Sequence, residues 1–139
     1  MFYQMFATYS FHDTKIDDIE ILSDGIVLLC NEGLNLLTHN PSDGNKTPSC
    51  KVKICIDNFD SKHLLQNLEI KKSRKNKTRE IEFNLFSRLL KKDAFKVYFD
   101  YYCYFSRSIK LEGVSNSFYF SLTISDINKL EVIYLSNPN

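Results

Sequence analysis

The chain has 139 residues, 43% of them hydrophobic, with 11 Phe and 8 Tyr but only 4 Gly and 3 Pro. This length predicts a single domain over residues 1–139, and the low Gly and Pro content excludes a collagen-like or low-complexity chain. The net charge is only +1, which is far from the strongly basic balance of a dedicated nucleic-acid-binding module.

Residues 16–22 predict a first strand, with a break in its apolar alternation at residues 17–18. The dipeptide Asp24-Gly25 that follows is typical of a type I′ hairpin turn, in which both central residues have positive φ. The apolar run 26–30 then predicts a strand that is buried on both faces.

The middle of the chain predicts a loop, two strands and a helix. Residues 38–49 contain two prolines and predict the loop. Residues 51–57 alternate between apolar and charged side chains as a half-buried strand does, and residues 64–70 predict another strand. The apolar residues of 81–90 fit both the alternation of a strand and the periodicity of a helix. We expect a helix there, because the apolar positions share one helical face and lysines 91–92 suit the negative end of a helix dipole.

The last third of the chain is strand-like. In an extended segment 95–105 one face carries six mostly apolar side chains, which we expect to form core: Phe95, Val97, Phe99, Tyr101, Cys103 and Phe105. Further strands are expected at 108–111, 117–124 and 130–135. The sum predicts an α+β fold that is predominantly antiparallel β: a bent sheet, sandwich or open barrel of six to eight strands with one helix.

His12 and Asp13 form the first candidate site. A histidine beside an aspartate can act as a general base whose ring the carboxylate orients. Adjacent residues on an extended chain point to opposite faces, however, so the pair needs a bend to make contact. We expect a structural role first, with Asp13 capping a turn, a binding role second and catalysis third.

Three tyrosines form the second candidate site. Tyr98, Tyr102 and Tyr104 lie on the face of the 95–105 strand opposite the expected core. If that face is open, it is a candidate protein-binding surface, because exposed tyrosines are typical of interface hot spots. If the helix covers it, the tyrosines belong to a second core layer. The sequence favours neither alternative.

The third candidate site is the basic segment 71–79. It holds six cations, of which four are taken as candidate binding residues: Lys71, Lys72, Arg74 and Lys75. Cations at this density can contact phosphates, and nearby aromatic strands can offer faces on which bases stack. The simpler interpretation, which we favour, is an exposed hairpin tip that its charges keep solvated.

No metal or cofactor is expected. The spacing of Cys50 and Cys55 does not suit tetrahedral zinc, and no glycine-rich phosphate loop is present. The N-terminal residues lack the basic start of an export signal, and no apolar run approaches the roughly 20 residues of a membrane-spanning helix. We therefore expect a cytoplasmic protein with reduced cysteines and no membrane partner.

The opening 11–16, the Asp-Gly hairpin and the closing strands 118–124 and 130–135 resemble a loose group of small bacterial β-rich proteins. These are largely uncharacterised, carry a His-Asp-Ser/Thr-x-Ile opening, and in part resemble immunity proteins that neutralise the toxins of rival bacteria. The resemblance implies a non-enzymatic protein that occludes a partner protein, and it supplies no catalytic residues. The alternatives are a nucleic-acid-binding module that uses residues 71–79 and an enzyme of unknown class.

Overall fold

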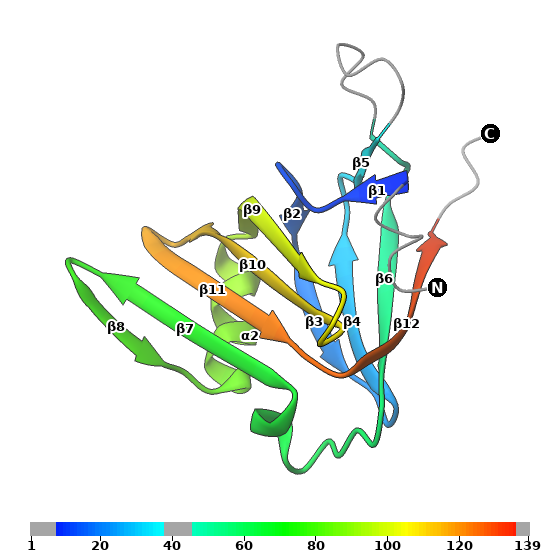
Figure 1. The fold of residues 1–139 in the computed structure, drawn as a ribbon. Helices are drawn as coiled ribbons and strands as arrows, with labels where there is room; N and C mark the ends of the chain where they lie inside the picture. The colour runs from blue at the N-terminus through cyan, green and yellow to red at the C-terminus, as the bar shows by residue number, and fades with distance from the viewer. Residues whose placement is uncertain (1–7, 38–45, 136–139) are drawn as a thin grey trace.

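The computed structural model describes residues 8–37 and 46–135, which form antiparallel sheets and helix α2 (Phe83–Lys92) (Figure 1). The six-stranded sheet has the order β2 (Lys15–Ile16), β9 (Phe95–Cys103), β10 (Ser108–Ser115), β11 (Phe118–Ile124), β7 (Leu68–Arg74), β8 (Lys77–Glu80). The four-stranded sheet has the order β12 (Ile127–Tyr134), β6 (Cys50–Ile56), β4 (Gly25–Cys30), β3 (Asp18–Ile21). A small sheet pairs β1 (Tyr9–Ser10) with β5 (Asn35–Leu36).

This arrangement confirms the expected α+β class with predominantly antiparallel strands, and the sheets are open rather than closed into a barrel. The described residues contain twelve strands, more than the six to eight expected. Three of them have only two residues and leave no alternation to detect, and β8 has no apolar residue. The expected loop at residues 38–49 lies mostly outside the described residues.

The chain passes from the six-stranded to the four-stranded sheet at Asp17, between β2 and β3. The Asp17 N–H donates to the Leu29 carbonyl over 2.8 Å, and the Asp17 carboxylate accepts from the Asn31 N–H over 2.8 Å. The predicted break in alternation is confirmed, and its cause is this transfer between sheets.

A second transfer, at Ser125 and Asp126, carries the chain from β11 into β12. The Ser125 N–H donates to the Asn67 carbonyl over 2.9 Å, and the Asp126 carbonyl accepts from the Asp57 N–H over 2.9 Å. Because the sheets are joined at two corners, their inner faces and α2 share one cluster of buried side chains. Burial of this apolar surface is the main force that holds the sheets together.

The hairpin between β3 and β4 does not contain the predicted type I′ turn. Neither Asp24 nor Gly25 has a positive φ, so that prediction is wrong. Gly25 instead begins β4, and a Cβ on it would lie 1.9 Å from the Ile54 carbonyl oxygen of β6. The glycine is needed because two strands approach each other closely here. The dipeptide sequence alone does not show whether its glycine serves a turn or such a close approach.

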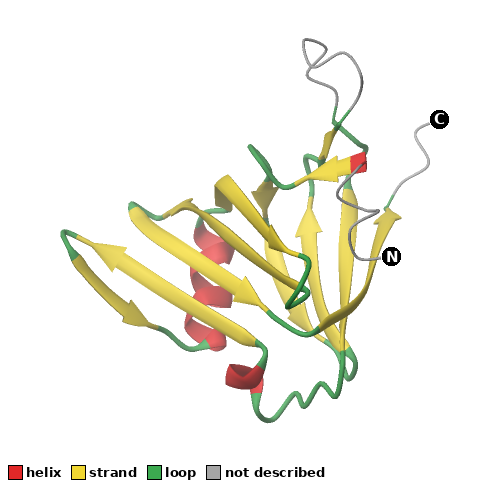
Figure 2. Cartoon of the chain, viewed as in Figure 1, coloured by secondary structure: helices red, strands yellow, loops and turns green. Residues whose placement is uncertain are grey.

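Helix α2 confirms the helix expected at residues 81–90, and it covers the inner face of the six-stranded sheet (Figure 2). The Phe86 ring centroid lies 5.8 Å from that of Phe95 and 5.4 Å from that of Phe120, in edge-to-face contacts. No helix among the described residues is long and apolar enough to cross a membrane. The strand expected at 64–70 is wrong in its first half, where residues 64–66 form a 3₁₀ turn before β7.

A β-bulge in β9 reverses the faces that were expected for this strand. Gly113 of β10 pairs with Val97 and Glu112 pairs with Phe99, which leaves Tyr98 as the extra residue. Phe95 and Val97 are fully buried, but Phe99 is 52% exposed and Tyr101 is 51% exposed. The expected core face is therefore wrong beyond Val97: Cys103 and Phe105 are also exposed, and Asp100 and Tyr102 point inward instead.

Candidate functional site

The opening turn, Phe11 to Thr14, precedes β2. The Thr14 N–H donates to the Phe11 carbonyl over 3.0 Å. Asp13 has a φ of +56°, which is typical of the third residue of a type II turn. This bend places His12 Nδ1 3.0 Å from Asp13 Oδ2, with side chains that are 53% and 57% exposed. The pair thus makes the contact that an extended chain would forbid.

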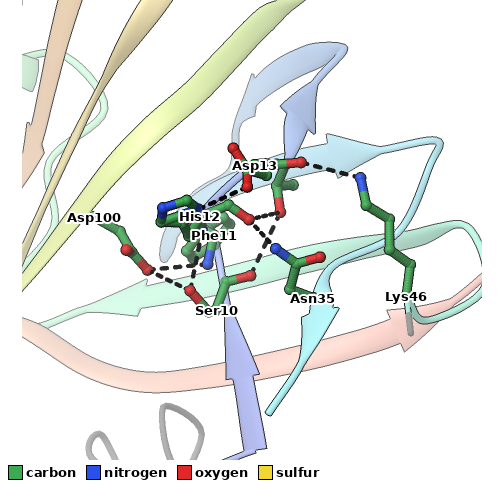
Figure 3. Close-up of polar contacts among 8 residues, drawn as sticks. Ser10, Phe11, His12, Asp13, Asn35, Lys46 and Asp100 are labelled. Atoms are coloured by element: carbon green, nitrogen blue, oxygen red, sulfur yellow. Dashed lines mark hydrogen bonds and ion pairs between the residues drawn. The ribbon is translucent and has the colours of Figure 1, made fainter. Parts of the chain in front are cut away.

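Ser10 and Asp100 make the hydrogen bonds that were expected of Asp13. Ser10 Oγ accepts from the His12 N–H over 3.0 Å. Asp100 Oδ2 accepts from the Phe11 N–H over 3.1 Å and from Ser10 Oγ over 2.9 Å (Figure 3). The prediction that Asp13 caps the turn is wrong, because its carboxylate is paired with His12. Asp100 lies 89 residues from Phe11 in the chain, so no local signal indicated it.

Two side chains from the other side of the turn hold its backbone (Figure 3). Asn35 Nδ2 donates to the His12 carbonyl, and Lys46 Nζ donates to the Asp13 carbonyl over 3.0 Å. The Asp13 N–H donates to the Val97 carbonyl over 2.9 Å, which ties the turn to β9. The opening turn is therefore a fixed corner of the fold.

Tyr102 belongs to this corner and not to an open tyrosine surface. Its hydroxyl donates to Asp100, and it lies 3.5 Å from the Phe11 nitrogen. Burial raises the pKa of Tyr102 well above its ordinary value, and the hydrogen bond to the Asp100 carboxylate adds to the shift. Of the three predicted tyrosines, only Tyr98 and Tyr104 are exposed, at 37% and 59%.

The chemistry available at the opening turn is limited. Among the described residues, the only side-chain partner of the His12 ring is the carboxylate of Asp13. In the same part of the chain, no group of three His, Cys, Asp or Glu side chains could hold a metal ion.

The second region is the outer face of the six-stranded sheet, the face away from α2. The bulge at Tyr98 turns Phe99 and Tyr101 to this face, where Tyr119 of β11 joins them with 37% exposure. We call these three residues the outer aromatic patch. Sequence reasoning missed all three, because it placed Phe99 and Tyr101 in the core and gave Tyr119 no role.

Glu112 of β10 lies at the centre of the outer aromatic patch. It pairs directly with Phe99 across the strands, and its Oε2 accepts from the Tyr119 hydroxyl over 2.9 Å. Lys110 Nζ lies 3.2 Å from Glu112 Oε1. Desolvation and this hydrogen bond raise the pKa of Tyr119 to about 12. Aromatic rings around a paired charge make a surface that is both apolar and polar, as protein interfaces are.

The third region is the β7–β8 hairpin, whose two faces differ in charge. Strand pairing places Lys72 opposite Arg79 and Arg74 opposite Lys77. All four side chains lie on the inner face, because Lys72 also pairs with the buried Phe120. Phe118 shares this face at the beginning of β11.

The other two predicted basic residues do not share the inner face of the paired strands. Lys71 is on the outer face, where its Nζ lies 3.5 Å from Glu69 Oε1 and its backbone pairs with Glu80. Lys75 is in the turn itself, with a φ of +49°, and lines the same open hollow as Lys72 and Arg74. The structure thus brings Lys72 and Arg74 together with Lys77 and Arg79, and it separates Lys71 from them.

No protein-family model, no curated protein and no solved structure matches this chain. The resemblance of the opening to immunity-like bacterial proteins stays a prediction.

Proposed function

We propose that this chain is a non-enzymatic binding protein that engages another protein through the outer aromatic patch, in the manner of an immunity protein that occludes its target. The observation that carries the proposal is the exposure of Phe99 and Tyr101, about half of each side chain, on a sheet face that α2 leaves uncovered. Leaving large apolar side chains in water forgoes roughly 1.5–3 kcal/mol for each when it could be buried.

The composition of the outer face supports a protein as the partner. Aromatic residues are enriched at the centres of protein interfaces, where they provide most hot spots. Around the patch the same face carries charges of both signs, Lys110 and Glu112 on β10 and Lys71 and Glu69 on β7. A mixed rim of this kind favours a protein surface over a uniform polyanion.

The rigidity of the face also supports occlusion. Phe99 and Tyr101 lie on β9 and are paired with β10, while β2 on the other side of β9 pairs only with Phe95 and Lys96. Such a surface loses little conformational entropy on binding, since its backbone is already ordered. The enzyme alternative rests on the His12–Asp13 contact alone among the described residues.

The test is a comparison of capture by the native protein and by a Phe99→Ser/Tyr101→Ser variant. We expect the native protein to retain one stoichiometric protein from its source lysate after nuclease treatment and at moderate salt. The double variant should lose that protein, because two central anchors typically supply several kcal/mol of binding free energy. The captured protein should then lose its own activity in a 1:1 complex with the native chain.

A Leu65→Ser/Ile133→Ser variant is the matched control. It also replaces two exposed apolar side chains, which are 71% and 44% exposed and lie outside the patch. Retention of the partner by this control assigns binding to the patch. Equal capture by the Phe99/Tyr101 variant, or no protein that survives nuclease, would refute the proposal.

A further inference from the structure

The inner face of the β7–β8 hairpin borders an open hollow of about 790 Å³. Its lining consists of Phe118, Thr78, the turn residues Lys75 and Asn76, and the four cations that share the inner face of the strands: Lys72, Arg74, Lys77 and Arg79. No residue of α2 lines it, and the tip of the hairpin extends beyond the helix in Figure 1. We call this region the basic hollow.

The four cations on the inner face of the hairpin take part in no ion pair within the described part of the chain. The ion pairs of residues 8–37 and 46–135 include none to these four side chains. Lys72 and Arg79, and likewise Arg74 and Lys77, are direct cross-strand partners. Like charges in this position repel each other and destabilise a sheet. A bound anion would relieve this repulsion.

The opposite face of the same hairpin is different. Ser73 Oγ and Thr78 Oγ1 share a hydrogen bond of 2.7 Å, and Lys71 is paired with Glu69. A hairpin that needed charge only for solubility would gain as much from cations on either face. The concentration of four unpaired cations on the hollow face therefore points to a negatively charged ligand.

Phe118 gives the basic hollow an aromatic surface. Lys72 Nζ lies 4.1 Å from the centre of the Phe118 ring, and Arg74 Cζ lies 5.4 Å from it. These cation–π contacts hold both charged groups over the hollow. Unpaired bases stack on aromatic rings and on guanidinium planes, whereas the bases of a duplex are already stacked on each other.

We propose that the basic hollow binds single-stranded nucleic acid, with the four cations on consecutive phosphates and Phe118 and Arg74 beside an unpaired base. Alternate residues of a strand are about 6.8 Å apart and neighbouring strands about 5 Å apart, which spreads the charges along a chain of phosphates. Arginine also offers a planar fork that matches phosphate oxygens.

The experiment measures fluorescence anisotropy of labelled single-stranded oligonucleotides over a salt series. Four phosphate contacts predict a slope of log K against log salt of about −3, or a loss of roughly 50-fold in affinity between about 50 and about 200 mM salt. A duplex of equal length, polyglutamate and anionic lipid vesicles are measured beside it.

Two variants with the same change of charge locate the site. A Lys72→Gln/Arg74→Gln/Lys77→Gln/Arg79→Gln variant takes the net charge from +1 to −3 (+1 − 4) and should lose at least tenfold in affinity and most of the salt slope. The matched control also removes four exposed cations, none of which lines the basic hollow, and should bind like the native protein: Lys62→Gln, Arg88→Gln, Lys91→Gln and Lys92→Gln. Circular dichroism verifies that both fold.

A Phe118→Leu variant separates stacking from charge. It should weaken binding by about tenfold and leave the salt slope unchanged, since stacking involves no counterion release. Binding that the control variant loses equally, or that duplex, polyglutamate or vesicles match, would overturn the proposal. So would an absence of binding at low salt. The outer aromatic patch is on the opposite face, so neither result decides the proposed protein partner.

Discussion

Gly113 lies so close to the backbone of Lys96 that a Cβ built on Gly113 would be 1.8 Å from the Lys96 carbonyl oxygen. Gly113 is also the residue at which the β9–β10 register shifts and Tyr98 becomes the extra residue. A glycine on β10 thus permits the bulge on β9, and the bulge exposes Phe99.

Gly113→Ala is expected to destabilise the fold by about 1–3 kcal/mol, because the added methyl group meets backbone that cannot move aside without breaking the ladder. Urea unfolding measures the change. Ser121→Ala, on the outer face of β11, is the control and should change stability by less than about 0.5 kcal/mol. A Gly113→Ala protein as stable as the native one would show that the close approach is not needed.

Asp100→Ala is expected to cost about 2–4 kcal/mol of unfolding free energy, since it leaves the Phe11 N–H, the Ser10 hydroxyl and the Tyr102 hydroxyl without their acceptor. Tyr102→Phe removes only one of these bonds and should cost about 1 kcal/mol. Tyr101→Phe, at a half-exposed position, should stay within about 0.5 kcal/mol of the native protein. Equal effects of Tyr102→Phe and Tyr101→Phe would contradict the buried network.

Alkaline titration should show that Tyr119 ionises with a pKa of about 12, above the ordinary 10.0. Because the folded-state pKa is raised, the associated stability is complete below the unfolded pKa of about 10 and is lost as pH rises through the folded pKa. Glu112→Gln should lower the Tyr119 pKa only in part, because desolvation by burial still raises it. Phenolate absorbance, compared with a Tyr119→Phe protein, reports the titration. An unchanged midpoint in Glu112→Gln would mean that the carboxylate does not act on the phenol.

The four cysteines should react with a thiol reagent in three stages. Cys103 is exposed and its pKa is lowered by a hydrogen bond from Ser106, so it should react first. Cys55 is partly buried and should follow. Cys30 and Cys50 are fully buried and should react only on unfolding. A Cys103→Ser protein should lack the fast stage. Rapid reaction of all four in the native protein would be inconsistent with this burial.

The periodicity of apolar residues predicted those helices and strands that have one buried face and one solvent-exposed face. Residues 51–57 gave strand β6 with the expected inward side chains, and the periodicity of 81–90 gave α2. The break at residues 17–18 was visible because it interrupts a short pattern. These features depend on local sequence, which is why they could be predicted.

The error in the 95–105 strand had a distant cause. Its aromatic alternation continues without interruption, and the residue that permits the bulge is Gly113 on a neighbouring strand. Turn types were missed for a related reason. The positive φ values that type I′ turns need occur at Lys75 and Asn76, between β7 and β8, although Asp24-Gly25 has the more typical sequence. Pairing of the flanking strands decides the turn.

The sequence predicted candidate sites as continuous segments, whereas in the structure each site is a face formed by residues from several strands. The basic segment 71–79 was found from composition, but only strand pairing shows that Lys72 and Arg79 share a side. Phe118 could not be assigned to that side, since it joins the hairpin through the β11–β7 pairing. The neighbours of a strand are set by topology, and topology was not available from the sequence.

Strand β6 lies between β12 and β4 in the four-stranded sheet. During synthesis β3, β4 and β6 leave the ribosome early, whereas residues 127–134 of β12 leave after all the other described strands. Until then one side of β6 presents unpaired backbone N–H and C=O groups, and an uncovered edge of this kind is a template for pairing with other chains. A nascent chain of this protein is therefore expected to be most prone to self-association, and most dependent on chaperones, between completion of β6 and arrival of β12.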